Sequence, residues 1–276
     1  MPRSNSACRR FFDKVVKRQL TRLAAILVVF LAPSALHSAE LVQTIARIKP
    51  SVVGIGTVLH SRSPAVQFVG TGFIVADGRH VITNALVVDR PLDSARLEAP
   101  VVLISGKEGE PQARTAQLIA VDKEHDLAIL KIGGEPLPAL TLGDSSRVRE
   151  GQTLAFTGFP IAMVLGFYPA THRGMIAAIT PVVRPGITAK TLNAKMINSI
   201  RDSSYNVFQL DGTAYPGNSG SPLYDPDDGA VYGIINSVLV QGNRESALSR
   251  PSGITYAIPG LHIRDFLRRE KIPGFE

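Results

Sequence analysis

The chain has 276 residues but only one cysteine, Cys8, which lies within the first forty residues. The rest of the chain has no thiol that could form a disulfide or ligate zinc. This lack excludes cysteine catalysis and a disulfide framework. With 45% hydrophobic residues, a chain of this length can bury a substantial core without such cross-links. We therefore expect a globular protein that needs neither a metal nor a cofactor.

A hydrophobic run long enough to cross a membrane is also lacking. The apolar stretch 23–32, just before Pro33, has about 10 residues, whereas a spanning helix needs about 20. Seven basic residues precede this stretch, and Ser38 and Ala39 follow it. This order predicts a signal peptide over residues 1–39, and therefore export to the periplasm or secretion. The alternative is an uncleaved anchor, which would be the only membrane contact of the chain.

Once this segment is set aside, the chain has almost no excess of positive charge. Residues 1–39 carry seven Lys or Arg and one Asp, which is six of the seven net positive charges. A mature chain that starts at Glu40 is close to +1. Nucleic-acid binding needs a basic patch over the domain, and no RNA-binding or zinc-finger spacing is present. We therefore exclude nucleic acid as a partner.

Short apolar runs recur about every ten residues from Val52 onward, with Gly, Pro or Asp between them. This spacing is typical of an all-β sandwich or barrel. Asp77-Gly78 predicts a hairpin between two of the runs. Helical periodicity is confined to Leu41–Ile48 and Leu261–Arg269. The expected strands are 52–59, 70–75, 80–83, 116–121, 127–132, 153–157, 175–179, 206–210, 230–240 and 254–258.

A series of motifs in a fixed order resembles the trypsin-like serine peptidases, and within them the HtrA-like periplasmic group. The motif Gly217-Asn-Ser-Gly-Ser-Pro resembles the nucleophile loop of the family. One motif alone is weak, but the whole ordered set is specific. The other motifs are Gly70-Thr-Gly-Phe-Ile-Val, Val81-Ile-Thr-Asn-Ala, Asp126-Leu-Ala-Ile-Leu-Lys-Ile, Leu142-Gly-Asp-Ser-Ser, His172-Arg-Gly-Met-Ile-Ala-Ala-Ile, Tyr232-Gly-Ile-Ile-Asn-Ser and Tyr256-Ala-Ile-Pro.

The resemblance implies an all-β fold of two antiparallel six-stranded β-barrels, with a short helix at each end. Residues 40–276 would form one trypsin-like peptidase domain. Within it, 40–145 would be the N-terminal barrel, 146–259 the C-terminal barrel and 260–276 the C-terminal helix and tail. Only 18 residues follow Ile258, so we expect no carboxy-terminal peptide-binding (PDZ) domain. The trimers of HtrA-like proteins are therefore not implied, and the oligomeric state stays open.

The resemblance also implies the site residues. Ser219 would be the nucleophile and Asp126 the orienting acid, while Gly217, Asn218 and Ser219 would form the oxyanion hole. A serine hydroxyl attacks only when an imidazole takes its proton, and a buried carboxylate holds that imidazole in the right tautomer. Glycines beside the serine let backbone N–H groups face the oxyanion. By itself, Gly-Asn-Ser-Gly would be read as a tight turn.

The sequence departs from the family at the general base. The family strand ends Thr-Asn-Ala-His, whereas this chain has Thr83-Asn84-Ala85-Leu86. Leucine has no titratable atom, so it can neither accept a proton from Ser219 nor protonate a leaving amine. In subtilisin, loss of the histidine costs about 10⁶ in turnover. Ordinary proteolysis is therefore expected to be lost.

Another histidine does not offer a replacement on sequence grounds. His80 lies six residues before Leu86, about 20 Å away on an extended strand. His125 precedes Asp126 directly, and neighbours on a strand point to opposite faces. His60, His172 and His262 fall in a loop, in the second half and in the terminal helix. We expect each to be structural or solvated.

Without an imidazole, the Asp126 carboxylate has two alternative interpretations. It is buried and accepts hydrogen bonds, with Asn236 as one donor, or it is a turn residue with access to water. For the substrate pocket, the family position six residues before the nucleophile is Thr213, an uncharged floor. Asn236, Ser237 and Val238 would form the wall, and Val238 would narrow the pocket towards small aliphatic side chains.

Two functions follow from these motifs. One is an exported, non-catalytic trypsin-fold protein that binds an extended peptide, an unfolded envelope protein or another partner. The other is an active serine endopeptidase that cleaves after small aliphatic residues with an unusual base or substrate assistance. The retained Ser219 and Asp126 favour the second, and Leu86 favours the first more strongly. A single-nucleotide change or a sequence error at position 86 is the third explanation.

Overall fold

The computed structural model describes residues 33–106, 109–160, 166–182, 205–236 and 253–275. The chain divides into two units, residues 1–43 and 44–276, and most of the predicted signal peptide lies outside the described residues. Helix α2, Pro33–Ile48, crosses this boundary and begins before the expected Leu41. Within the described ranges, no helix has both the length and the apolar character needed to span a bilayer.

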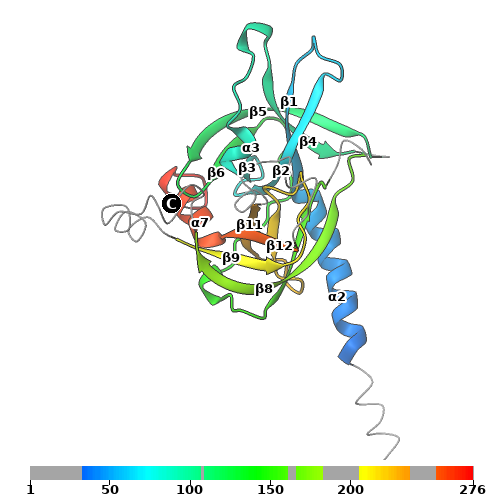
Figure 1. The fold of residues 1–276 in the computed structure, drawn as a ribbon. Coiled ribbons are helices and arrows are strands. Elements are labelled where there is room, and N and C mark those ends of the chain that lie inside the picture. The colour runs from blue at the N-terminus through cyan, green and yellow to red at the C-terminus, as the bar shows by residue number, and fades with distance from the viewer. Residues whose placement is uncertain (1–32, 107–108, 161–165, 183–204, 237–252, 276) are drawn as a thin grey trace, which may run out of the picture. The chain divides into compact units, whose positions relative to one another are not determined.

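Six strands of the second unit form a closed antiparallel barrel in the order β1-β2-β3-β6-β5-β4, seen in the upper part of Figure 1. β2 and β3 form the expected hairpin, with Gly78 at φ +80° in its turn. This left-handed conformation suits glycine, which has no Cβ to clash with the backbone. The strands are β1 Val52–Val58, β2 Val66–Val75, β3 His80–Thr83, β4 Ala99–Ser105, β5 Pro111–Asp122 and β6 Leu127–Ile132.

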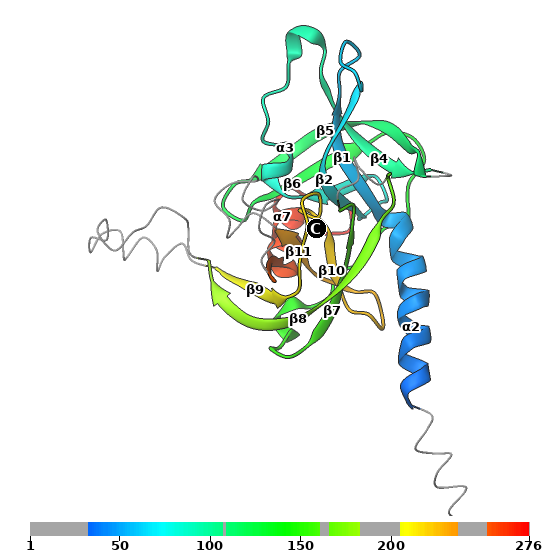
Figure 2. The ribbon, with the colours of Figure 1, turned by 45° about the vertical axis from the view of Figure 1, so that its right-hand side comes forward.

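A second closed antiparallel barrel follows in the order β10-β11-β12-β9-β8-β7. Figure 2, turned by 45°, brings β7 and β10 into view, which pair to close it. Its strands are β7 Thr153–Gly158, β8 Ala170–Pro181, β9 Asn206–Asp211, β10 Pro222–Tyr224, β11 Val231–Asn236 and β12 Ile254–Pro259. The two six-stranded barrels confirm the predicted all-β fold. Residues 133–152, between β6 and β7, connect them.

Short helices complete the second unit. Helix α7, Gly260–Arg269, packs its buried Ile263, Phe266 and Leu267 against the molecule, as the apolar spacing of that segment predicted. Helix α3, Ala85–Val88, follows β3 directly. Three short 3-10 helices are also described: η1 Lys49–Ser51, η2 Ser94–Arg96 and η4 Ser145–Arg147.

Each of the ten expected strands is present, and several are longer than expected. β3 and β6 have the predicted bounds, whereas β2 begins at Val66 and β8 at Ala170. β11 ends at Asn236, so the last part of the expected strand 230–240 lies outside the described residues. The extension of β8 is mostly polar and carries little apolar signal, whereas that of β2 includes the partly buried Val66, Phe68 and Val69. Pairing with neighbouring strands holds both extended.

Three elements were not expected. β4 is held between β1 and β5. β10 has only three residues, too few for a periodic pattern, and is fixed by pairing with β7 and β11. Helix α3 contains Val87 and Val88, residues that favour strands. Its turn is set by tertiary contacts, because the Ala85 N–H donates to the Asp126 carbonyl oxygen at 3.1 Å.

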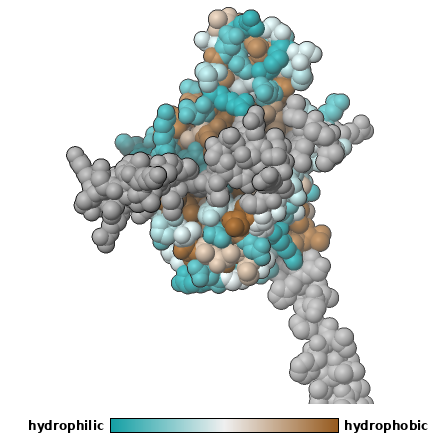
Figure 3. All heavy atoms as spheres, in the orientation of Figure 1, coloured by the Kyte–Doolittle hydropathy of each residue, from teal (hydrophilic) through white to brown (hydrophobic). Residues whose placement is uncertain are grey.

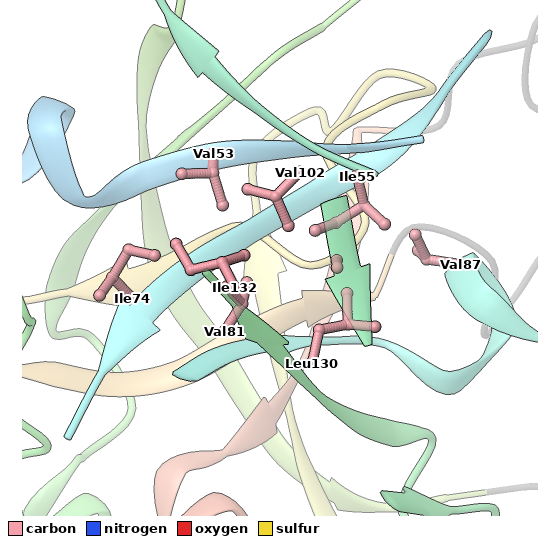
Figure 4. Close-up of a cluster of buried hydrophobic side chains, with 9 residues drawn as sticks. Val53, Ile55, Ile74, Val81, Val87, Val102, Leu130 and Ile132 are labelled. Atoms are coloured by element: carbon pink, nitrogen blue, oxygen red, sulfur yellow. The ribbon is translucent and has the colours of Figure 1, made fainter. Parts of the chain in front are cut away.

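The core of the first barrel is a cluster of aliphatic side chains. Val53 and Ile55 of β1 meet Val81 of β3 and Leu130 of β6, and Val87 reaches the cluster from α3 (Figure 4). The second barrel has its own cluster around Phe156 and Phe208. On the face in Figure 3, brown residues occur in small groups among teal and white ones. Single exposed apolar side chains of this kind are ordinary on protein surfaces.

Candidate active site

Asp126 occupies the turn between β5 and β6 and has φ +52°. Asp tolerates this left-handed conformation better than most residues. Its carboxylate accepts a hydrogen bond from the Leu86 N–H at 2.8 Å and from the Asn236 side-chain amide at 2.6 Å. The Asn84 amide donates to its carbonyl oxygen at 3.1 Å. Asn236 is thus a donor to Asp126, as the first of the two sequence interpretations expects.

The electrostatics of Asp126 follow from its surroundings. Burial raises the pKa of the carboxyl group from 3.8 to about 6, although the hydrogen bonds from Leu86 and Asn236 favour the charged form. The exposed Asp89 raises the pKa a little further. An imidazolium beside this carboxylate would lower its pKa, but position 86, whose backbone N–H contacts the carboxylate, is leucine. Among the described residues, the acid is therefore held in place without a cationic partner.

Leu86 is the second residue of α3 and contacts the site in two ways. Its backbone N–H donates to Asp126, so replacing the side chain leaves this hydrogen bond in place. Its partly buried side chain packs against the aliphatic cluster of the first barrel, next to Val87. Leucine therefore suits the packing at this position, which accounts for an intact fold around a site that has no imidazole there.

Residues 217–222, which resemble the nucleophile loop of the family and are called the nucleophile loop below, lead into β10. Gly217 has φ +100° and Gly220 has φ +92°, conformations that a residue with a Cβ rarely adopts. The Asn218 N–H donates to the Tyr215 carbonyl oxygen at 3.0 Å, and the Gly220 N–H donates to Ile235 of β11 at 2.9 Å. The loop is thus a tight turn and is also hydrogen-bonded to the neighbouring strand.

Two side chains of this loop are buried. Ser219 is 5% exposed and Asn218 is fully buried. Among the described residues, none forms a hydrogen bond with the amide atoms of the Asn218 side chain. The structure therefore brings Leu86 and Asp126 together in the first barrel, and Gly217, Asn218 and Ser219 together at the start of β10.

The loop is joined to the first barrel through Thr71 of β2, a residue that the sequence analysis did not single out. The Thr71 N–H donates to the Ser219 carbonyl oxygen at 2.9 Å, and its hydroxyl donates to the Gly217 carbonyl oxygen at 2.6 Å. The only sequence signal was a threonine between Gly70 and Gly72 in an otherwise apolar run. Asn236 connects the barrels a second time, because it lies in β11 and donates to Asp126.

The predicted pocket residues are described only in part. Thr213 is partly buried in the segment between β9 and the nucleophile loop. Asn236 is buried, and its side-chain amide is committed to Asp126. Ser237 and Val238 lie outside the described residues.

Three of the histidines have neighbours outside the nucleophile loop or are exposed to solvent. His80 is buried at the β2–β3 hairpin, where its Nδ1 lies 2.7 Å from Asp77. His172 of β8 stacks on Phe156 with ring centroids 5.1 Å apart, and burial lowers its pKa. His60 is exposed in the loop after β1. Within the described residues, no hydrogen bond joins a histidine to Ser219.

His125 and His262 form a separate cluster beside the Asp126 turn. Their rings stack at 4.3 Å, and Tyr205 lies 4.8 Å from each. The Nδ1 atom of His125 lies 3.0 Å from the Asp122 carboxylate, which also pairs with Arg269 of α7 at 3.0 Å. Burial raises the pKa of Asp122, but these partners outweigh it and bring that pKa down to about 2. Over the described part of the chain, no cluster of His, Cys, Asp or Glu could hold a metal ion.

Comparisons with known proteins show that the chain belongs to the trypsin-like peptidase family. Residues 70–234 match the family model described as the trypsin-like peptidase domain. A "Probable periplasmic serine endoprotease DegP-like" of Halomonas elongata is 31% identical over 204 residues, 73% of this chain and 35% of that protein. Human "Serine protease HTRA4" is 32% identical over 227 residues, 81% of this chain and 40% of that protein. The chain thus spans well under half the length of these curated relatives.

Solved structures agree as well. The structure titled "HtrA-type protease AlgW with tripeptide" shares 26% sequence identity and a TM-score of 0.56, over 82% of this chain and 63% of that one. A second structure, with a decapeptide, shares 24% identity and a TM-score of 0.58. The second likeness concerns the fold alone.

Proposed function

Because the chain belongs to the trypsin-like peptidase family and is similar to its HtrA-like members, we propose that it is an exported serine endopeptidase homologue with impaired catalysis. In this proposal Ser219 is the nucleophile, Asp126 the orienting acid and Leu86 the degenerate base position. The Gly217 and Ser219 N–H groups face the oxyanion, with Asn218 between them. Thr213, Asn236, Ser237 and Val238 line the first pocket.

One observation carries the impaired catalysis. The Asp126 carboxylate accepts hydrogen bonds from Asn236 and from the Leu86 backbone, so it is oriented toward the base position. The side chain at that position has no nitrogen to accept the Ser219 proton or to return it to a leaving group. The acid is in place, but the group that it would orient is missing.

Peptide binding is the activity that needs no base. The AlgW relatives are titled as complexes with a tripeptide and a decapeptide. An extended peptide pairs with the edge of a strand through main-chain hydrogen bonds, which do not involve position 86. The names of the DegP-like relatives place them in the periplasm. We therefore propose an extended peptide or an unfolded envelope protein as the partner.

An active endopeptidase that cleaves after small aliphatic residues is the second candidate. The observation in its favour is the Asp126 pKa of about 6, which lies in the range where a carboxylate acts as a general base near neutral pH. Direct proton transfer from Ser219 to such a carboxylate would replace the missing imidazole. The hydrophobic side chain of Leu86 at the base position opposes this route.

A fluorophosphonate probe, which labels only activated serines, tests the two candidates. The full chain would be compared with Leu86→His, Ser219→Ala and the double variant Leu86→His/Ser219→Ala. We expect no labelling of the parent and at least a hundredfold faster labelling of Leu86→His, because the imidazole returns next to an oriented Asp126. The double variant is the matched control, since it restores the imidazole but removes the nucleophile.

Labelling of the parent that Ser219→Ala abolishes would overturn the impaired-catalysis proposal and favour the second candidate. Failure of Leu86→His to label would show that the site has a defect beyond the missing imidazole. Peptide binding is measured separately by titrating the parent with fluorescent extended peptides. A micromolar dissociation constant would support the binding role.

A further inference from the structure

The hydrogen bonds between the first barrel and the nucleophile loop converge on Thr71 of β2, which is fully buried. We propose that Thr71 is the positioning residue of this loop: its hydroxyl fixes the orientation of the Gly217–Asn218 peptide between the two oxyanion N–H groups. The inference rests on the proposed function, in which this loop presents Ser219. It adds a residue in the other barrel on which the geometry of the nucleophile depends.

The direction of the hydrogen bond is fixed by chemistry. A carbonyl oxygen only accepts, so the Thr71 hydroxyl must donate its one proton to Gly217, at 2.6 Å. The lone pairs of the same oxygen face the Phe159 N–H, which donates at 3.1 Å. Both roles of the hydroxyl are used. A valine of nearly the same shape would supply neither.

Because the peptide bond is planar, a contact at the Gly217 carbonyl oxygen also sets the orientation of the Asn218 N–H. The Gly217 carbonyl and the Asn218 N–H belong to one rigid plane. Thr71 binds the oxygen of this plane, and the Tyr215 carbonyl accepts from its N–H at 3.0 Å. Gly217 is a glycine at φ +100°, so the backbone has little preference of its own for this orientation. The contacts at the two ends of the plane therefore decide it.

The approach of the loop to β2 is close as well as hydrogen-bonded. A Cβ at Gly220 would overlap the Thr71 carbonyl oxygen, so no side chain fits between them. That oxygen accepts from the Thr83 hydroxyl at 2.7 Å. Thr83 ends β3, and the chain then enters α3 and Leu86. The network thus connects the nucleophile loop to the strand that carries the base position.

The test uses the full chain with Leu86→His as the labelling background. Thr71→Val removes the hydroxyl at constant shape, and Thr71→Ser restores it without the methyl group. We expect Thr71→Val to slow fluorophosphonate labelling at least tenfold, about 1.4 kcal/mol, and Thr71→Ser to return it to within threefold. Such rescue by the hydroxyl is not expected if only packing matters.

Thr255→Val is the matched control for lost stability. The Thr255 hydroxyl is buried, donates to the Gly212 carbonyl oxygen at 2.6 Å and accepts from the Ala214 N–H at 2.8 Å. The Thr255 hydroxyl has the same two hydrogen-bond roles, but with Gly212 and Ala214, which flank the proposed pocket residue Thr213 and lie outside the nucleophile loop. We expect Thr255→Val to lower the melting temperature as Thr71→Val does and, with a probe that places no side chain in that pocket, to leave the labelling rate unchanged. Equal labelling rates of Leu86→His with and without Thr71→Val would overturn the proposal.

A second measurement keeps this inference separate from the proposed function. If Leu86→His does not label at all, the site has a defect beyond the missing imidazole, and amide hydrogen exchange then tests Thr71 in the parent chain. We expect Thr71→Val, but not Thr255→Val, to speed exchange at residues 217–221. Unchanged exchange in this segment would overturn the role of Thr71, whatever the chemistry of the site.

Discussion

The two barrels share one strand order, because β7 to β12 repeat the sequence of neighbours seen in β1 to β6. The barrels differ in the interactions that position the site residues that each one carries. The second barrel presents the nucleophile loop through glycines at positive φ and close backbone contacts. The first presents position 86 on a short helix, where the backbone makes the hydrogen bond and the side chain is replaceable. The hydrogen bond to Asp126 at position 86 therefore does not depend on the side chain, whereas the geometry of the nucleophile loop depends on the absence of side chains at Gly217 and Gly220.

Substitution of Gly220 is the strongest way to test this comparison. Gly220→Ala places a Cβ on the Thr71 carbonyl oxygen and forces a residue with a side chain into φ +92°. We expect the free energy of unfolding to fall by about 3 kcal/mol or more, from strain and displaced packing. Urea denaturation of the full chain measures it.

Gly151→Ala is the control for backbone strain. Gly151 has φ +86°, and no atom lies within 4 Å of an added Cβ. Gly151→Ala should therefore lower the free energy of unfolding by only about 1–2 kcal/mol. Equal losses for the two variants would show that the nucleophile loop does not depend on its contact with the first barrel.

Two aspartates at either end of one turn sharpen the comparison within the first barrel. Burial raises the Asp126 pKa to about 6, so the folded state loses stability as pH rises from 3.8 to about 6. Asp126→Asn should then increase the free energy of unfolding at pH 7 by about 3 kcal/mol, with little change near pH 4. Asn236 can turn its amide to accept from the new side chain.

Asp122 should show the opposite sign. Burial raises its pKa, but His125 and Arg269 outweigh this and hold it at about 2. Its contribution is present above pH 3.8 and is lost as pH falls toward 2. Asp122→Asn should therefore lower stability at pH 7 by about 2 kcal/mol. If denaturation gave both variants the same sign, the structural difference between the two carboxylates would be wrong.

The parts of this molecule that the sequence predicted are those with local signals. The β-strands of 80–83 and 127–132 contain the short apolar runs 81–82 and 127–130, and the hairpin at Gly78 has its turn residues. Leu86 at the family's histidine position stays a prediction, which rests on the ordered motifs that flank it. Thr71 was missed, since its partners Gly217 and Phe159 are distant in sequence and meet it only when both barrels have closed. Helix α3 was missed for the same reason.

The smallest expected effect concerns the contact between α7 and the Asp126 turn. Burial, with the nearby His125, lowers the His262 pKa to about 4, while Asp265 and Asp122 oppose this change. The unfolded chain binds more protons between pH 4 and 6.5, so stability falls as pH decreases through that range. Because the ring is partly exposed, we expect a loss of only about 1–2 kcal/mol.

This loss has the opposite slope to that of Asp126 over the same pH range, so the two partly cancel in the parent chain. The measurement therefore uses Asp126→Asn as the background and adds His262→Phe, which keeps an aromatic ring against His125 and Tyr205. We expect the added change to raise stability at pH 5 by about 1 kcal/mol and to leave it unchanged at pH 7. The same pH slope with and without His262 would show that α7 and the acid turn are not coupled through this histidine.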